Sequence, residues 1–325
     1  MPKGSLPRTR LRHYCQLASL CVAITLTGYS PSPAPDAGTA TPSLNHEQEA
    51  ITPIPQPPSA DPAKIALGER LFYDHRLSHD GTLACSSCHD LQTNGAAHRT
   101  TARNGSRMSF TTLTVFNAAL SFRLNWEGNY RTLEAQAQSS LENPANMGTS
   151  IPEVLNKLDA DPQMVGQFKS VYGTAPDRKS LLDAIATFER SLVTPDSRFD
   201  HWLAGDADAL TADEKAGYEL FKSFGCISCH QGVNVGGNLY ERHGIFHPLG
   251  SPLPELLRVP SLRNVATMAP YFHDGSVSNL DDAVRQMGLA QLDRKLSDQQ
   301  IAAIVAFLKT LTGKFRDHPV VAAAP

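Results

Sequence analysis

Two copies of one five-residue pattern constrain this chain more than any other feature of its sequence. The first copy, CSSCH, runs from Cys85 to His89, and the second, CISCH, runs from Cys226 to His230. The chain has six cysteines and 12 histidines among 325 residues, so random placement would give far less than one C-x-x-C-H match. The same chemical requirement is therefore met twice, about 140 residues apart.

Three kinds of site use paired cysteines at this spacing. A structural zinc site brings four ligands together, usually with the second pair within about 20 residues of the first, and needs no histidine after each pair. A thioredoxin-like dithiol follows a strand, whereas the residues that flank both copies here have helical patterns. A covalent c-type haem accounts for all three fixed residues of the C-x-x-C-H pattern. The two thiols reach the vinyl groups on one haem edge, and the histidine becomes the proximal iron ligand.

The sequence therefore predicts two covalently bound c-type haems. In each copy the cysteines hold the haem and the histidine is the metal ligand. The residues are Cys85, Cys88 and His89 for the first haem and Cys226, Cys229 and His230 for the second.

The N-terminus predicts export. Four basic residues and no acid precede an apolar run, LASLCVAITLTGYS, of the length found in signal peptides. We predict a signal peptide over residues 1–30 and a periplasmic location, where thiols can meet haem outside the cytoplasm. The alternative is an uncleaved anchor. Cys15 and Cys21 would leave with the signal, so the four remaining cysteines all belong to the two pentapeptides.

Composition limits the mature chain further. Residues 31–61 are rich in proline and alanine and poor in apolar anchors, which predicts a disordered linker. Without the signal the chain has 25 basic and 32 acidic residues, a net charge of −7. An acidic body without a basic stripe argues against binding to nucleic acid. No later apolar run reaches the roughly 18 residues that a membrane span needs, so we expect no transmembrane span in the mature chain.

Helical patterns bracket both pentapeptides. In the C-terminal half, capping boxes at Thr211 and Ser297 predict an opening helix before Cys226 and a closing helix that ends before Gly313 and packs across the opening one. In the N-terminal half, ALGERLFYD precedes Cys85, and residues 180–192 form a long amphipathic pattern. Between them, the sequence predicts capped helices whose starts are Thr132, Ser150 and Asp161.

These patterns predict a mainly α-helical chain with little strand, built from two tandem cytochrome c-like haem domains. The shared GERLF and GYELF stretches before each C-x-S-C-H support the tandem arrangement. We place the N-terminal haem domain at 62–205 and the C-terminal haem domain at 206–316. Residues 317–325 are expected to be a disordered tail.

Longer stretches identify a resemblance to a known family. The segments LGERLFYDHRLSHDGTLACSSCH, TVFNAALSFRLNWEGNYRTLEAQA, ATFERSLVTPDSRFDHWLAGD, GYELFKSFGCISCHQG and VPSLRNVATMAPYFHDGS closely resemble the bacterial diheme cytochrome c peroxidases. The likeness covers residues 62 to 314 in unbroken order. It implies a periplasmic enzyme that reduces hydrogen peroxide to water with electrons from a small cytochrome c or blue copper protein, and it implies a possible homodimer.

The resemblance also implies a division of labour between the haems. The N-terminal haem keeps a coordination position for peroxide, and the C-terminal haem accepts and relays electrons. It places the second ligand of the C-terminal iron at Met287, with Met268 as the competing methionine. Trp126 matches the tryptophan between the two haems, and a core role is its alternative.

Further site residues follow from the same resemblance. Gln136 matches an active-site glutamine. Arg263 and His273 are expected either to pair with haem propionates or to make ordinary structural hydrogen bonds. A calcium ion between the domains would use the carbonyls of Met268 and Pro270, with Thr111 where the family has an asparagine.

The sequence departs from the family where peroxide would be cleaved. Asn146 stands at the position of the catalytic glutamate, and an amide cannot take up and return a proton, although it can orient peroxide. Glu142 is the candidate replacement if its carboxylate points to the distal side. The histidine that caps the resting N-terminal iron in many relatives is missing as well. Arg103 or Asn104 stands there, and His98 and Met108 are the nearby alternatives.

Three functions remain open. The first is a diheme peroxidase with a soluble electron donor. The second is an electron carrier or peroxide sensor that lost turnover with its glutamate. The third is oxidation of residues of a partner protein, as in the related maturation branch, where a tyrosine replaces the methionine; Met287 disfavours this function here.

Overall fold

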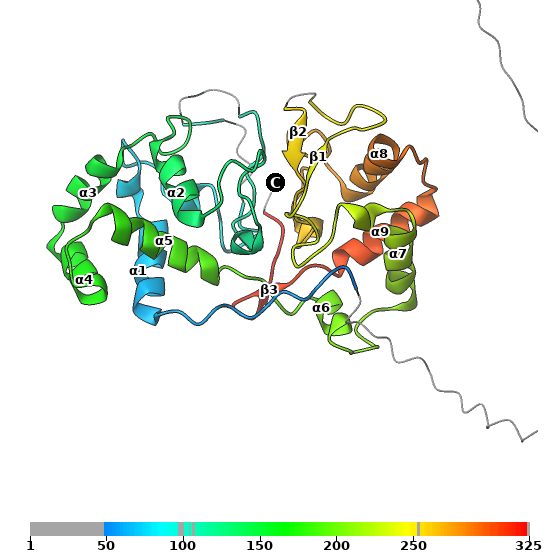
Figure 1. Cartoon of the computed structure of the whole chain (residues 1–325), viewed down its shortest axis with the longest axis horizontal. Coiled ribbons are helices and arrows are strands. Elements are labelled where there is room, and N and C mark those ends of the chain that lie inside the picture. Colours follow the sequence, from blue (N-terminus) through cyan, green and yellow to red (C-terminus); the bar gives the residue numbers. More distant parts are fainter. Residues whose placement is uncertain (1–48, 97–100, 104, 106–107, 252–253, 324–325) are drawn as a thin grey trace, which may run out of the picture. The chain divides into compact units, whose positions relative to one another are not determined.

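The computed structural model describes residues 49–96, 101–103, 105, 108–251 and 254–323. This part of the chain is mainly α-helical, as predicted, and its named strands form two short antiparallel pairs (Figure 1). None of its helices has the length and hydropathy that a bilayer crossing requires. The helices are α1 (Pro62–Phe72), α2 (Leu133–Glu142), α3 (Ile151–Asp159), α4 (Pro162–Tyr172), α5 (Arg178–Ser191), α6 (Arg198–Leu203), α7 (Ala212–Ser223), α8 (Leu280–Leu292) and α9 (Asp298–Lys309). The strands are β1 (Tyr240–Arg242), β2 (Leu256–Arg258), β3 (Lys314–Phe315) and β4 (His318–Pro319).

The predicted helix starts are confirmed. Thr211 and Ser297 accept hydrogen bonds from Glu214 N and Gln300 N, and each forms a full capping box. Helix α9 ends at Lys309, earlier than the sequence pattern indicated. The reason is a tighter turn, in which Thr310 donates from both its main-chain nitrogen and its hydroxyl to Phe307 O.

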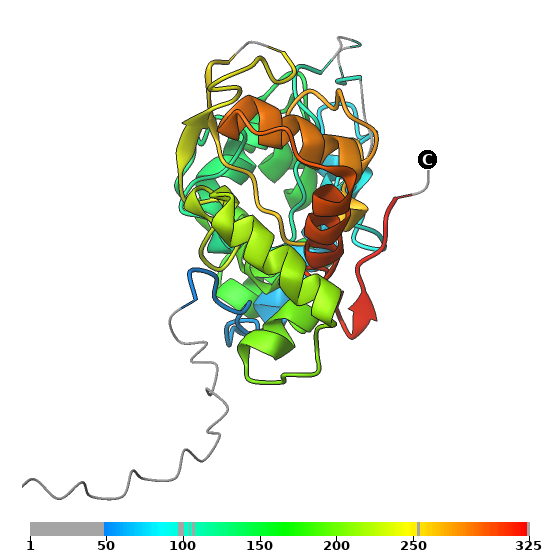
Figure 2. The same ribbon diagram turned by 90° about the vertical axis from the view of Figure 1, so that its right-hand side faces the viewer.

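Each haem-binding half is built around a close crossing of two helices. Helix α1 packs against α5 in the N-terminal half, and α7 packs against α9 in the C-terminal half (Figures 1 and 2). The crossing points are Gly68 and Gly217, the glycines of the GERLF and GYELF stretches. A Cβ atom on Gly68 would lie 2.1 Å from Ala184 O, and one on Gly217 would lie 1.9 Å from Ala303 O. The shared glycine therefore permits backbone contact at the same place in both halves.

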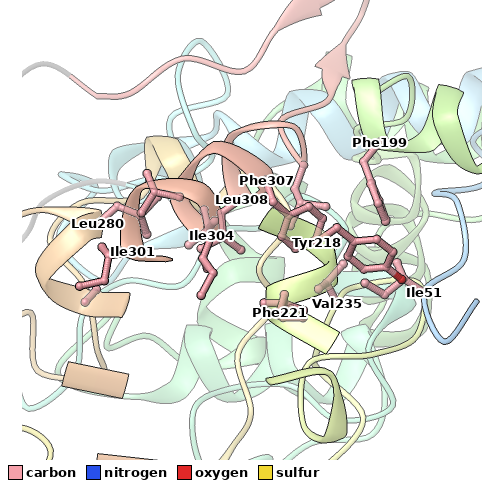
Figure 3. Close-up of a cluster of buried hydrophobic side chains, with 14 of the residues drawn as sticks. Ile51, Phe199, Tyr218, Phe221, Val235, Leu280, Ile301, Ile304, Phe307 and Leu308 are labelled. Carbon is pink, nitrogen blue, oxygen red and sulfur yellow. The ribbon is translucent and has the colours of Figure 1, made fainter. Parts of the chain in front are cut away.

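The C-terminal core is dominated by aromatic rings. Figure 3 shows Phe199, Tyr218, Phe221 and Phe307 gathered beside the aliphatic side chains of α9. The ring centroids of Phe199 and Phe307 are 5.1 Å apart in an edge-to-face arrangement, and those of Tyr218 and Phe307 are 4.9 Å apart. Such pairs add to the stability gained from burial. They fix α6, α7 and α9 relative to one another.

The prediction of a disordered linker over 31–61 is wrong for its last part. Ile51 is only 1% exposed and belongs to the C-terminal core, and Ile54 is buried too. Glu49 accepts a hydrogen bond of 2.6 Å from the Tyr218 hydroxyl. The segment is anchored because Ile51 packs into the C-terminal core and because Arg263 and Asp200 form hydrogen bonds with the main chain of Thr52 and Ile54. Residues 31–48 lie outside the described residues.

The prediction of a disordered tail is also wrong, for residues up to Val320. Strands β3 and β4 form a hairpin, and Val320 is buried against residues of the N-terminal half such as Phe116 and Phe188. Arg316 pairs with Glu69 at 2.8 Å. Segments that flank the C-terminal half therefore pack on both cores. The domain boundaries at 205 and 316 stay a prediction.

The helix crossing gives a testable prediction. Gly217→Ala should lower the free energy of unfolding by about 2 kcal/mol, because its methyl group would collide with the carbonyl of Ala303. The control is Gly166→Ala, in the middle of α4 with open space around it, which should raise stability by about 0.5–1 kcal/mol. Urea unfolding of the haem-loaded protein measures both. Equal effects of the two substitutions would contradict the close crossing.

Candidate functional site

Both pentapeptides adopt the same local structure. Cys85–Ser87 and Cys226–Ser228 each form one turn of 3-10 helix shortly after the opening helix of their half. In each copy the main-chain nitrogen of the histidine donates to the carbonyl of the first cysteine, at 2.9 Å for His89 and 3.0 Å for His230. The turn thus holds two cysteines and a histidine in one fixed relation.

The two histidines are prepared in the same way. His89 Nδ1 donates to Gly95 O, and His230 Nδ1 donates to Val235 O, both at 3.2 Å. Burial lowers the pKa of His89, and it lowers the pKa of His230 to about 4. Both rings are therefore neutral near pH 7, with Nδ1 protonated and Nε2 left as the free lone pair. This is the form in which imidazole binds a metal.

The described cysteines are not grouped as the ligands of a thiolate metal site would be. Burial raises the pKa of Cys85 to about 12 and that of Cys226 to about 11, which favours the neutral thiol. No group of three or more His, Cys, Asp or Glu side chains that could hold a metal ion occurs among the residues that the structure covers. The arrangement instead suits covalent attachment, with one histidine per pair.

Both pentapeptides open into a single cavity of about 990 Å³. Its wall includes all four cysteines, both histidines, and side chains from both halves of the chain. Most of the exposed wall is apolar, and several buried polar atoms of its lining residues have no hydrogen-bond partner, among them Nε2 of His273. A large apolar space that ends at two neutral imidazoles fits a pair of haems, and the unpartnered nitrogen can donate to or accept from a polar group of one of them.

The halves also share an internal structural repeat beyond the pentapeptides. Asn117 and Asn264 both adopt the left-handed conformation, with φ of 60° and 61°, and both begin a short 3-10 helix. Both also bond to the same side chain, because each donates from Nδ2 to Thr194 Oγ1, at 2.7 and 3.0 Å. Seven residues after each asparagine a β-bridge begins, Leu124 with Tyr130 and Tyr271 with Val277.

The repeat continues into the helices that cover the cavity. Helix α2 follows the first bridge, and α8 follows the second, with the N-caps Thr132 and Asn279 at equivalent places. Five equivalent positions of the two helices line the cavity. They are Leu133, Gln136, Ala137, Ser140 and Leu141 on α2, and Leu280, Ala283, Val284, Met287 and Gly288 on α8.

This correspondence places Ser140 where the other half has Met287. Both residues line the cavity, but a methionine thioether could serve as a haem-iron ligand, whereas a serine hydroxyl is not one of the usual haem ligands. Ser140 instead accepts a hydrogen bond of 3.5 Å from Asn146 Nδ2. The two halves therefore differ at the position predicted for the second ligand of the C-terminal iron.

Comparison with known proteins agrees with this geometry. Residues 62–208 match the family model described as di-haem cytochrome c peroxidase, and residues 214–312 match the cytochrome c model. The chain is 40% identical to the cytochrome c551 peroxidase of Nitrosomonas europaea, over 82% of this chain and 84% of that protein. The chain belongs to the di-haem cytochrome c peroxidase family. Two haems, one in each half, follow from this membership.

The chain is also similar to a second cytochrome c peroxidase in sequence and to a MauG-like protein in structure. The chain is 40% identical to the cytochrome c peroxidase Ccp of Escherichia coli, over 84% of this chain, but it spans 63% of that protein's length. The crystal structure of a MauG-like protein associated with microbial copper homeostasis superposes with a TM-score of 0.69 at 28% identity, covering 80% of this chain and 94% of that one.

Trp126 lies where the two halves meet. Its Nε1 donates to Thr111 O at 2.9 Å, and its carbonyl accepts from Arg258 N, at 2.8 Å. In the repeat, Trp126 is equivalent to His273, and the two rings contact each other edge to face, with centroids 6.3 Å apart. Both residues line the cavity between the pentapeptides. The contact between the rings of Trp126 and His273 is compatible with the prediction that Trp126 lies between the two haems.

The predicted peroxide-side residues separate into two groups. Gln136 and Asn146 line the haem cavity. Glu142 does not line it: this carboxylate is exposed, accepts a hydrogen bond of 3.0 Å from Gln138 Nε2, and contributes to a separate surface groove. The structure thus gives no support to Glu142 as the relocated acid, because the last turn of α2 directs it away from the haem.

The segment that lacks the capping histidine also reaches the cavity. Arg103 lines it, donates from its main-chain nitrogen to Ala145 O at 2.9 Å, and pairs with Asp80 at 3.4 Å. Met108 lines the cavity as well. Asn104 and His98 lie outside the described residues.

Arg263 is held by protein groups. Its guanidinium donates to Asp200 Oδ1, Thr52 O and Val233 O, each at 2.8 Å, and the side chain is 1% exposed. Burial lowers the pKa of Arg263, and the Asp200 carboxylate opposes that shift. Of the two roles expected for Arg263, this arrangement favours the structural one over propionate pairing.

Two residues of this site, His243 and Glu189, were not predicted from the sequence. The rings of His243 and His273 are in tilted contact, with centroids 4.6 Å apart, and both ring nitrogens of His243 face carbonyls, Nδ1 that of Leu249 and Nε2 that of Pro254. Glu189 lines the cavity from α5. Neither lies in a recognisable motif, and Glu189 occupies a helix whose pattern looks like that of an ordinary amphipathic helix.

The repeat predicts which methionine binds the C-terminal iron. Met287→Ala should abolish the methionine–iron absorption band and lower the midpoint potential of that haem by a sizeable part of the roughly 0.8 V range that axial ligands span. The matched control is Met268→Ala, because Met268 also lines the cavity but is equivalent to Ser121 rather than to a helix position. If Met268→Ala loses the methionine–iron band and Met287→Ala keeps it, Met268 is the ligand and the assignment from the repeat is wrong.

Proposed function

We propose that this protein reduces hydrogen peroxide to water, with electrons that enter at the C-terminal haem and pass to the N-terminal haem. The donor would be a small cytochrome c or blue copper protein. The observation that carries the proposal is the pair Ser140 and Met287. One half carries a ligand that closes its iron, and the other half carries a hydroxyl at the same place, which leaves room for peroxide.

The same difference sets the direction of electron flow. A thioether ligand raises the potential of the C-terminal iron, which suits a centre that collects electrons. Bound haem supplies the electron transfer and the cleavage of the O–O bond. The contact of Trp126 with His273 supports transfer between the halves, because it bridges them within one cavity.

The residues of this chain that face peroxide are amides. Gln136 and Asn146 can orient peroxide by donating hydrogen bonds, but neither can take a proton from one oxygen and return it to the other. The peroxidase reaction requires two protons as well as two electrons. Proton delivery in this protein therefore depends on water or on other titratable groups.

Asn146 also favours a second candidate function. Without the family's glutamate, the protein would act as a diheme electron carrier or peroxide sensor with little turnover. Oxidation of residues of a partner protein is a weaker alternative, because Met287 stands where that branch has a tyrosine. A periplasmic location with an N-terminal signal, a homodimer, and a calcium ion at Met268 and Pro270 stay predictions.

Peroxide consumption with a reduced cytochrome donor separates these functions. Asn146→Glu should raise kcat/KM for peroxide by about 100-fold, because a positioned acid–base group contributes at least that factor. The control Glu142→Gln should leave the rate unchanged, since Glu142 faces the surface groove.

Peroxide turnover of the natural protein distinguishes a peroxidase from a carrier or sensor. Measurable turnover in it supports the proposed peroxidase, whereas an inert natural protein that gains turnover with Asn146→Glu identifies a carrier or sensor. A loss of activity in Glu142→Gln would contradict the placement of that residue.

A further inference from the structure

Helix α5 places a carboxylic acid in the wall of the haem cavity. Glu189 is 8% exposed and lines the cavity near the first pentapeptide. Its Oε2 is buried and has no hydrogen-bond partner. A buried carboxylate without a partner is costly, so such a group either stays protonated or faces a positive charge that the cavity holds.

The surroundings of Glu189 offer little positive charge. Arg190, the next residue, pairs instead with Glu134 of α2, whose carboxylate acts on Glu189 as a like charge. On α1, which also packs against α5, the charged side chains have other partners: Lys64 pairs with Asp183, Glu69 with Arg316, and Arg70 with Gln163 and Asp161. The 3-10 helix Ala118–Leu120, which contacts α5 as well, carries no charge.

Burial and, to a smaller extent, the charge of Glu134 together raise the pKa of Glu189 to about 8, although Arg190 opposes the shift. At neutral pH the side chain is therefore protonated in the polypeptide. Its charge is also felt at the haem attachment point, because an ionised Glu189 raises the pKa of the Cys85 thiol, second only to burial. Glu189 is thus electrostatically coupled to the residue that bonds the N-terminal haem.

We propose that Glu189 is the residue that takes up a proton when the N-terminal haem is reduced. This inference rests on the haem-binding part of the proposed function and not on turnover with peroxide. One electron enters the haem, which lowers the positive charge of the iron by one, and one proton from solvent binds to the carboxylate of Glu189. On oxidation the electron leaves and the proton returns to solvent, so charge is conserved in both directions.

The sign of the effect follows from electrostatics. An ionised Glu189 stabilises the oxidised iron, and a neutral Glu189 does not. The midpoint potential of the N-terminal haem should therefore fall as pH rises through the range in which Glu189 loses its proton. Glu189→Gln keeps the shape of the side chain but removes the group that titrates. If Glu189 had only a structural role, this substitution would leave the pH dependence of the potential unchanged.

Spectroelectrochemical titration of the haem-loaded protein tests the proposal. In the natural protein the midpoint potential of the N-terminal haem should fall between pH values below and above about 8. Glu189→Gln should lose most of this fall and hold its potential near the low-pH value. Glu142→Gln, whose carboxylate lies in the surface groove, is the matched control and should keep the full dependence.

Infrared difference spectra of the natural protein provide a second test that needs no folded variant. Reduction at a pH near 8 should produce the carbonyl stretch of a newly protonated carboxyl group. An unchanged pH dependence in Glu189→Gln would assign the proton to another group, such as a haem propionate, and would overturn the proposal. So would the absence of a carboxyl signal on reduction. Either result leaves the peroxidase proposal intact, because that proposal is tested by peroxide turnover.

Discussion

The structure depends on one short turn that is used twice, from the first cysteine of each pentapeptide to its histidine. The turn fixes both thiols and the imidazole, and a hydrogen bond from Nδ1 to a main-chain carbonyl sets the tautomer of the ring. Burial keeps both imidazoles neutral. Everything around the turn serves to place it against the cavity: the opening helix before it, the glycine crossing behind it, and the loop that supplies the carbonyl.

From this common plan the two halves diverge at a few positions. Met287 and Ser140 occupy equivalent places over the cavity, and so do His273 and Trp126 at the junction of the halves. In the proposed function, this difference of one side chain separates an iron that stores electrons from one that can meet a substrate. The repeated scaffold thus provides two sites of similar geometry, and substitutions on that scaffold give them different chemistry.

The sequence predicted the parts that depend on local chemistry. The C-x-x-C-H spacing predicted two haems, which the family membership supports, and the capping boxes at Thr211 and Ser297 located helix starts. The sequence-based predictions failed where order depends on contacts between distant residues. Ile51 and Val320 are ordered because they pack against apolar side chains of other elements, and no local sequence pattern indicates such packing. The equivalence of Ser140 and Met287 was hidden too, since the repeat that relates them is preserved in backbone conformation more than in residue identity. Glu189 was missed because its burial depends on helices α1 and α2.

The central claim is that one iron is closed by Met287 while the other has an open position. Electron paramagnetic resonance of the natural protein in its oxidised resting state measures this directly, because the spin state reports the number of axial ligands. The account predicts one low-spin centre with histidine and methionine ligands and one high-spin centre, in equal amounts. Two low-spin centres in the resting protein, or a single haem per chain, would contradict it.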